Sequence, residues 1–356
     1  MFFRTKKEKT FMEREIFAQP KILSDILEGY LEDENIKLDI PTDIEKVVLV
    51  ASGSSFNCAR YCADLFDKIA NIEAAAVYSS EFLLKTIVPH SDKMLYIFIT
   101  QSGETSDTNK ALMKAKEYNL KTLCITNAEN SSIWKLSDYK INCRAGQEKS
   151  IAATKSLTAQ MLCTTLLVLK YAQIKGIDVS YYLKDLQTLP SAINGTLGLR
   201  NNIQKHAKLL HTYKNIIVSA DGMAYALARE SALKIKETSY KNIYAMVLGE
   251  FMHGHVAVMN NKATLIYTSA EKISERSINN INNIQKDYCP TLVIIGNSDE
   301  KIKTDFHFNI DTKDEVQKMF ANILIFQLIA LETALELKCD VDNPKGLHKI
   351  VIEKSV

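Results

Sequence analysis

Two short segments rich in small hydroxyl side chains follow apolar runs in the first half of the sequence. Ser52–Ser55 comes just after Val47–Val50, and Thr100–Thr105 comes just after Leu95–Ile99 and opens a helical pattern. Hydroxyl groups, free backbone N–H groups and the positive end of a helix dipole together favour a bound phosphate. The same residue types are also common helix caps and turn formers, so either segment alone fits a purely structural role. Together, after two strands, they favour a phosphate monoester on a small molecule, because neither contains the lysine of a P-loop.

The second half of the sequence carries a charged stripe on a predicted helix. Glu230, Lys234 and Glu237 are spaced i, i+4 and i+7 and therefore share one helix face. A solvated face with salt bridges has the same pattern. Alanine, leucine and isoleucine neighbours indicate a largely buried helix, where a charged stripe needs a cleft or a partner. His253 follows on a glycine-flanked turn and is an acid/base candidate, although a lone histidine is more often structural.

The elements that must position these residues alternate between short apolar strands and longer amphipathic helices. This alternation predicts an α/β fold, with a mostly parallel sheet flanked by helices in a flavodoxin-like three-layer arrangement. The pattern occurs twice: Gly53, Phe56, Ala59 and Arg60 match Gly222, Tyr225, Ala228 and Arg229 at an offset of 169 residues. We therefore expect two tandem copies of one domain. The expected segments are an N-terminal helical extension 1–44, a phosphate-binding domain 45–175, linker helices 176–211, a second domain with the charged stripe 212–338 and a C-terminal tail 339–356.

Composition excludes several other classes of protein. The 356 residues carry 44 basic and 42 acidic side chains, a net charge of +2, so a dedicated nucleic-acid binder is not expected. The seven cysteines are odd in number, lack CxxC spacing and fall mostly in apolar runs, so neither a metal nor a redox site is predicted. The start of the sequence lacks a signal peptide, and polar residues interrupt the apolar stretch 319–337. We expect a cytoplasmic protein that does not enter a membrane.

Six ordered motifs give the sequence a resemblance to the sugar isomerase (SIS) domain family, and in particular to the isomerase half of glucosamine-6-phosphate synthase and its stand-alone deaminase and deglycase relatives. The resemblance covers nearly the whole chain, from the segment FMEREIFAQP onward. The motifs are SGSS, TQSGETSDT, SIAATKSLTAQ, ESALKIKETSY, GEFMHGH and the NPKGLHK tail.

The resemblance implies a role for each matching residue. Glu237 matches the base that moves a proton between C1 and C2, and Lys234 matches the lysine beside it. His253 matches the ring-opening residue that the family takes from a neighbouring subunit, and Lys349 matches a tail lysine that forms a Schiff base with the open-chain ketose. The residues matching the sugar-phosphate ligands and their support are Ser54, Ser55, Thr100, Gln101, Ser102, Thr105, Ile151 and Glu230.

The implied activity is that of a phosphosugar isomerase and deaminase that needs no cofactor. Cys58, the first cysteine, lies within the sugar-binding unit, so we expect no glutaminase half in this sequence. The implied reaction converts glucosamine 6-phosphate to fructose 6-phosphate and ammonia, in a homodimer with shared active sites. Ala153, Met252 and His255 depart from the synthase pattern and leave the sugar substituent open. Cleavage of a fructosamine 6-phosphate, such as fructoselysine 6-phosphate, is an alternative. A non-catalytic sugar-phosphate sensor is another, although the retained Glu237 and His253 favour an enzyme.

Overall fold

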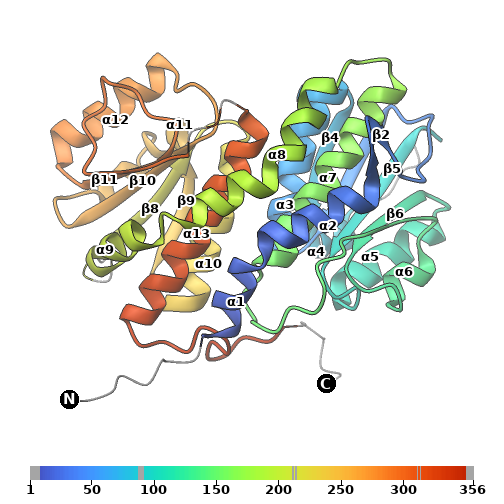
Figure 1. Cartoon of the computed structure of the whole chain (residues 1–356), viewed down its shortest axis with the longest axis horizontal. Coiled ribbons are helices and arrows are strands. Elements are labelled where there is room, and N and C mark those ends of the chain that lie inside the picture. The colour runs from blue at the N-terminus through green and yellow to red at the C-terminus, as the bar shows by residue number, and fades with distance from the viewer. Residues whose placement is uncertain are drawn as a thin grey trace.

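The computed structural model describes residues 9–86, 92–210, 212, 215–310, 312 and 314–349. The first residues of the expected N-terminal extension and residues 350–356 of the expected tail lie outside this description. Figure 1 shows two α/β domains side by side, each built on one parallel sheet. The predicted α/β fold with two tandem domains is confirmed.

Each sheet has five parallel strands, and both sheets have the same strand order. In each sheet the strand that comes second in the chain lies at the edge, outside the strand that comes first. This gives the flavodoxin-like order 2-1-3-4-5. Most central strand residues are buried, because helices cover both faces. The first sheet runs β4 (Glu73–Tyr78), β3 (Lys46–Ala51), β5 (Met94–Thr100), β6 (Lys121–Thr126), β7 (Tyr139–Asn142); the second runs β9 (Ile243–Val247), β8 (Asn215–Ala220), β10 (Ala263–Ser269), β11 (Thr291–Gly296), β12 (Phe306–Phe308).

The duplication extends to backbone detail. Strands β8 and β10 begin 169 residues after β3 and β5, the offset found in the sequence. Gly53 and Gly222 occupy matching positions at the carboxyl ends of the first strands, with φ of 56° and 55°. An L side chain rarely adopts this left-handed conformation, so glycine suits the sharp turn from strand to helix in both copies.

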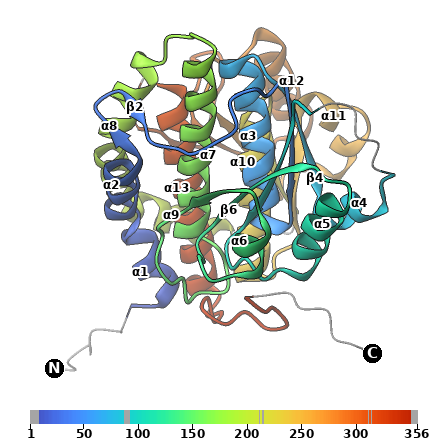
Figure 2. The same ribbon diagram turned by 90° about the vertical axis from the view of Figure 1, so that its right-hand side faces the viewer.

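One helical layer from each domain meets at the centre of the molecule. These layers are α3 (Gly53–Leu65) and α7 (Lys155–Ile174) from the first domain, and α10 (Ala224–Ser239) and α13 (Glu315–Glu336) from the second. Figure 2 shows these four helices together in the middle of the fold. Their apolar faces join one continuous core. The outer faces of the sheets carry α4 (Ser79–Leu84), α5 (Ser106–Glu117) and α6 (Ser132–Leu136) in the first domain, and α11 (Leu248–Phe251) and α12 (Glu275–Tyr288) in the second.

The remaining segments wrap around this core. The N-terminal extension forms α1 (Phe11–Phe17), α2 (Gln19–Tyr30) and a small hairpin of β1 (Leu31–Glu32) and β2 (Asn35–Ile36). The linker forms α8 (Ser180–Leu197) and α9 (Arg200–Leu210), and α2 and α8 pack against each other. By length and composition α13 could cross a membrane, but most of it is buried in the central layer, as in the core helix of a folded domain.

Candidate active site at the domain junction

The two hydroxyl-rich segments lie at the carboxyl ends of adjacent strands. Strand β3 pairs with β5 in parallel, and Ala51 is opposite Ile99, so the loops that follow both strands meet at one edge. Strand β4 lies on the other side of β3, which makes this edge the point where the strand order reverses. Ligands of open parallel sheets bind at such points. The two segments predicted to bind phosphate therefore lie next to each other, at the position where such sheets hold ligands.

The first loop directs its serines toward the central helices. Ser55 Oγ donates to Gln160 Oε1 on α7 at 3.1 Å. The hydroxyl of Ser54 lies within hydrogen-bonding reach of the Glu230 carboxylate on α10. Both serines are half-buried. The start of α3 thus faces residues of both domains.

The second loop is held by hydrogen bonds of its own. The hydroxyls of Thr100 and Thr105 are 3.1 Å apart, and Ser102 Oγ accepts from the Glu104 N–H at 3.1 Å. Glu104 in turn accepts from the Ser132 N–H and hydroxyl at 2.8 and 2.9 Å. These bonds fix the loop at the start of α5. Gln101 is half-buried in the same turn.

The charged stripe on α10 is an ion-pair network buried between the domains. Lys234 Nζ lies 2.5 Å from Glu237 Oε2 and 3.5 Å from Glu230 Oε1. The side chains of Lys234 and Glu230 are 1% and 2% exposed, whereas Glu237 is 22% exposed. The solvated-face alternative is therefore wrong. Glu237 is the member of the stripe that a ligand can reach.

Burial and charge act in opposite directions on the two buried members. Burial raises the pKa of Glu230, although the ammonium of Lys234 and the hydrogen bond from Asn57 oppose it. Burial lowers the pKa of Lys234, but the carboxylates of Glu237 and Glu230 outweigh burial and raise it above its ordinary value. Lys234 is therefore an ammonium at neutral pH and a fixed hydrogen-bond donor to Glu237.

Lys349 in the tail reaches a carboxylate that the sequence did not reveal. Its Nζ donates to Glu148 Oε2 at 2.5 Å and to the Ser150 carbonyl at 2.8 Å. The Glu148 side chain is completely buried, and Lys349 is 24% exposed. Glu148 also acts electrostatically on Lys234. The tail lysine and the α10 stripe thus belong to one charged cluster.

Backbone contacts hold the tail along the same edge. The Ile151 N–H donates to the Asp342 carbonyl at 3.2 Å. The Asp342 carboxylate accepts from the N–H groups of Phe11 and Met12, both at 2.8 Å. The Lys345 N–H donates to the Tyr240 hydroxyl at 2.5 Å. Figure 1 shows this segment after α13 running beside α1 at one end of the molecule.

His253 lies apart from this cluster. It is exposed in the turn after α11, and Gly254 follows with φ of 96°. Within the described part of the chain, no hydrogen bond or ion pair of its side chain is present. A role for His253 at Glu237 of the same chain therefore has no support in a single copy.

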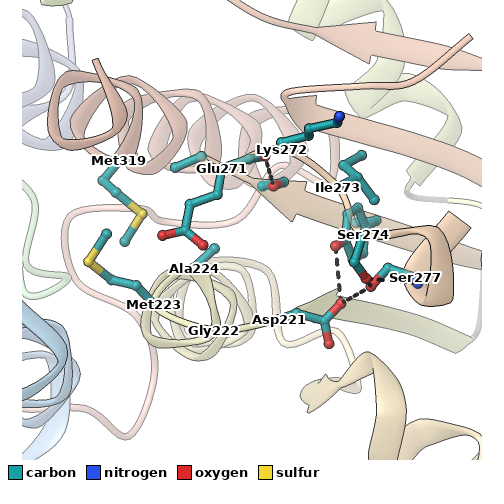
Figure 3. Close-up of a pocket in the computed structure, with 13 residues that line it drawn as sticks. Asp221, Gly222, Met223, Ala224, Glu271, Lys272, Ile273, Ser274, Ser277 and Met319 are labelled. Atoms are coloured by element: carbon teal, nitrogen blue, oxygen red, sulfur yellow. Dashed lines mark hydrogen bonds between the residues drawn. The ribbon is translucent and has the colours of Figure 1, made fainter. Parts of the chain in front are cut away.

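The corresponding edge of the second domain carries acidic side chains. A cavity of about 130 Å³ opens between the loops after β8 and β10, and Asp221 and Glu271 line it (Figure 3). Asp221 Oδ2 accepts from the hydroxyls of Ser277 and Tyr267 at 2.8 and 3.1 Å. Lys272 also lines this cavity, which therefore carries two acidic groups and one basic group, whereas the loops that meet in the first domain present mainly hydroxyls.

Two residues of the cluster escaped the sequence analysis, Glu148 and Asn57. The carboxylate of Glu148 accepts hydrogen bonds from Thr154 and Ser156 at the start of α7. An acidic residue just before a helix start with hydroxyl side chains was the sequence signal that could have identified Glu148 as a capping residue. Asn57 lies in the first turns of α3, two residues beyond the SGSS motif, and had no such signal. Across the described residues, no group of three or more His, Cys, Asp or Glu side chains could hold a metal ion.

Comparison with known proteins identifies two copies of one family model. The model described as SIS domain matches residues 42–170 and 209–337. The chain is 31% identical over 348 residues to the glutamine–fructose-6-phosphate aminotransferase [isomerizing] of Campylobacter jejuni, covering 96% of the chain and 58% of that protein. The protein of the same name from Methanococcus maripaludis is 32% identical over 344 residues, covering 96% and 56%. The chain thus spans little more than half the length of these relatives.

Solved structures of related proteins have the same fold as this chain. The C-terminal domain of glucosamine-fructose-6-phosphate aminotransferase from Francisella tularensis matches with a TM-score of 0.90 and 25% identity, covering 95% of the chain and 99% of that structure. Glucosamine-6-phosphate deaminase from Thermotoga maritima matches with a TM-score of 0.79 and 20% identity, covering 96% and 99%. The second likeness shows the fold alone.

Proposed function

The chain belongs to the SIS domain family, and from this membership we propose that it is a phosphosugar isomerase and deaminase. Its substrate is glucosamine 6-phosphate, and its products are fructose 6-phosphate and ammonia. The glucosamine-6-phosphate deaminase from Thermotoga maritima shares its fold. The observation that carries the proposal is the buried Lys234 ammonium, 2.5 Å from a partly exposed Glu237 carboxylate beside a hydroxyl-lined loop edge.

The phosphate of the substrate binds at the edge formed by the loops after β3 and β5. The positive ends of α3 and α5 point toward this edge, and Ser54, Ser55, Ser102 and Thr105 supply hydroxyl donors. The backbone N–H groups of the two helix starts add further donors. The phosphate thus fixes one end of the sugar, and C1 and C2 lie toward α10.

The ring must open before a proton can move. We assign ring opening to His253 of a second copy of the chain, because this residue is exposed on a turn and meets no described partner within its own chain. A neutral imidazole can take the C1 hydroxyl proton while another donor protonates the ring oxygen. The functional unit is then a homodimer with shared sites.

Glu237 transfers the proton in the next step. Its carboxylate removes the proton from C2 of the open-chain amino aldose, the electrons form a C1–C2 enolamine, and the C1 oxygen takes a proton from water. Return of the proton to C1 gives the C2 imine of fructose 6-phosphate. Lys234 holds this carboxylate in place through its ion pair with Glu237. Addition of water to the imine carbon then releases ammonia and leaves the ketose.

Lys349 is within reach of the same cluster through Glu148. We expect its amine, when deprotonated, to form an imine with the open-chain ketose and release water. No organic cofactor or metal takes part in the proposed reaction. The proposed setting is the cytoplasm, where hexose phosphates are made and used.

One assay tests the proposal. The purified protein is incubated separately with glucosamine 6-phosphate and fructoselysine 6-phosphate, and ammonia, lysine and hexose phosphate are followed. Release of ammonia with fructose 6-phosphate supports the deaminase. Lysine with glucose 6-phosphate from the second substrate would instead indicate a deglycase, and binding without any product would indicate a sensor.

A further inference from the structure

The hydroxyl proton of Ser55 is already engaged within the protein. Ser55 Oγ lies at the start of α3 and donates to Gln160 Oε1 on α7 at 3.1 Å. A serine hydroxyl carries one proton and two lone pairs, so it donates to one acceptor at a time. The oxygens of a phosphate monoester are strong acceptors. As long as Ser55 donates to Gln160, it therefore presents only lone pairs to a phosphate at this edge.

Ser102 in the second hydroxyl-rich loop is in the opposite state. Its Oγ accepts from the Glu104 N–H at 3.1 Å. Among the residues that the structure describes, no acceptor for the Ser102 hydroxyl proton is present. Ser102 can thus donate to a phosphate without any rearrangement, whereas Ser55 can do so only after a change at Gln160.

The side-chain amide of Gln160 has one end without a partner. The residue is 2% exposed, and its buried Nε2 finds no acceptor in the described part of the chain. Nearby polar groups on α7 are complete, since the hydroxyls of Thr164 and Thr165 donate to the Met161 carbonyl at 2.9 and 2.8 Å. A buried donor without a partner is unfavourable. Here it belongs to the residue that contacts the first loop.

Rotation of the amide exchanges its two ends. The oxygen and nitrogen ends of a glutamine amide have nearly the same shape, and a half-turn about the last side-chain bond places Nε2 where Oε1 was. Nε2 of Gln160 then donates to Ser55 Oγ, which frees the serine proton. Each orientation makes one bond to Ser55 and leaves the other end of the amide unpartnered by the described residues. A ligand that accepts the freed proton therefore decides between them.

We propose that Gln160 is a positioning residue that turns its amide when a sugar phosphate binds, and so redirects the Ser55 hydroxyl from the protein to the phosphate. Before binding, Gln160 accepts the Ser55 proton. After binding, Gln160 donates to Ser55 while Ser55 donates to the phosphate. This inference rests on the proposed function, because it concerns the phosphate site of that reaction. It does not depend on which amine leaves the sugar.

The side-chain amide of Gln160 reports the rotation directly in NMR spectra of the isotope-labelled full chain. Its NH₂ signals are assigned as the pair that disappears in Gln160→Met. Addition of fructose 6-phosphate should shift this pair, because Nε2 gains an acceptor. In Ser55→Ala the shift should be largely lost, since the rotated amide has no hydroxyl to donate to. Gln173 lies on the same helix, donates to the Glu34 carbonyl and should stay unshifted in both proteins.

Two results would overturn the proposal at this stage. One is an unchanged Gln160 signal in wild-type protein saturated with fructose 6-phosphate. The other is an equal shift in the wild type and in Ser55→Ala, which would show that the ligand acts on the amide without the hydroxyl. This measurement on the wild type and Ser55→Ala decides the matter even if substitutions of Gln160 do not fold.

Gln160→Glu tests the consequence for affinity. An ionised carboxylate only accepts, so the Ser55 proton stays directed at residue 160. Calorimetric titration with fructose 6-phosphate at about pH 8, where a carboxyl group is ionised, should show binding weakened by about tenfold or more. The added negative charge also weakens binding, and Ser55→Ala separates the two effects. In that background the same change should cost clearly less affinity.

Ser102→Ala is the matched control background. Ser102 does not contact Gln160, so Gln160→Glu should keep its full effect there. Equal losses of affinity in the wild-type, Ser55→Ala and Ser102→Ala backgrounds would show that charge alone is responsible, and the proposal would fail.

Failure of this inference can be told apart from failure of the proposed function. If the wild type binds fructose 6-phosphate but releases no ammonia from glucosamine 6-phosphate, the deaminase fails and the spectra still decide the role of Gln160. If ammonia is released but Gln160 and Ser55 show no coupling, only the inference fails. A folded wild type that binds no fructose 6-phosphate would overturn both.

Discussion

Asn57 Nδ2 donates to Glu230 Oε2 at 2.8 Å, and this bond joins the helix that begins at the first hydroxyl-rich loop to the helix that carries the charged stripe. Arg229 Nε donates to Asn57 Oδ1 at 3.2 Å and fixes the orientation of the amide. Both partners of the bond are buried. The two domains thus share a buried polar contact between α3 and α10.

Removal of this amide should cost stability. Asn57→Leu has a similar volume but leaves Glu230 Oε2 without its donor, so the free energy of unfolding should fall by about 1–3 kcal/mol. Urea denaturation measures the change. In a Glu230→Gln background the same substitution should cost less, because no buried charge is left unpaired. Equal losses in both backgrounds would show that the loss comes from packing alone.

Glu237→Gln should abolish turnover and leave sugar-phosphate binding intact. A general base contributes roughly 10²–10⁴-fold to rate, and the phosphate loops lie on the other domain. Steady-state kinetics with glucosamine 6-phosphate gives the loss, and calorimetric titration with a hexose phosphate should still show binding. A variant with a near-normal rate removes Glu237 from the mechanism.

The paired substitution Ser102→Ala and Thr105→Ala should weaken binding of the phosphorylated sugar. Each hydroxyl is a donor to a charged acceptor, which is worth about 1.5–3 kcal/mol, so KM should rise by at least tenfold. The corresponding change in the second domain, Ser274→Ala, is the control and should leave KM unaltered. An unchanged KM in the paired variant would make the loop after β5 a helix cap only.

Shared sites predict that two inactive variants restore each other. In a mixed dimer of Glu237→Gln and His253→Ala, one site carries both defects and the other carries none. Refolding the two proteins together should therefore recover activity, up to about one working site per mixed dimer. If each site lies within one chain, no mixing ratio restores activity, provided that mixed dimers are shown to have formed.

The burial of His206 predicts that the protein loses stability in acid. It is fully buried on α9 against the rings of Phe306 and Phe308, at centroid distances of 4.8 and 5.8 Å. Burial lowers the pKa of His206 from 6.5 to about 4. The unfolded chain therefore binds a proton more readily between these values, and stability falls as pH decreases from about 6.5 toward 4.

Between pH 7.5 and pH 5, protonation of His206 in the unfolded chain should lower the free energy of unfolding by about 2 kcal/mol. Urea denaturation of the wild type and of His206→Leu at both pH values isolates this contribution from that of the carboxylates. The leucine variant should show the smaller loss. Identical pH dependence of the two proteins would contradict the assignment.

Local patterns were sufficient to predict the parallel strands, the hydroxyl loops and the α10 stripe. Strand β6, Lys121–Thr126, is an example, because a short apolar run between turns specifies a buried strand. Helix α12 was not predicted, because its asparagines weaken the helical signal and packing of Ile278, Ile281 and Ile284 decides the outcome.

The charged cluster could be predicted only in part. The i, i+4, i+7 spacing brings Glu230, Lys234 and Glu237 together within one helix, and local geometry is sufficient for that. The pair of Glu148 and Lys349 depends on how the tail folds back, and no local periodicity encodes a contact between segments so far apart. Whether His253 serves a second chain stays a prediction.

The bonds between Asp342 and the start of α1 shorten the stretch of chain that links Lys349 to its nearest upstream anchor of this kind. From the end of α13, the free tether to Lys349 is 13 residues long; anchored at Asp342, it is seven. The entropic free energy of bringing Lys349 to Glu148 is about 0.6 kcal/mol smaller for the shorter tether. This raises the effective molarity of the amine at Glu148 about two- to threefold. The contacts of Asp342 with α1 on one side and with Ile151 on the other therefore raise the local concentration of this amine without adding any group to the site.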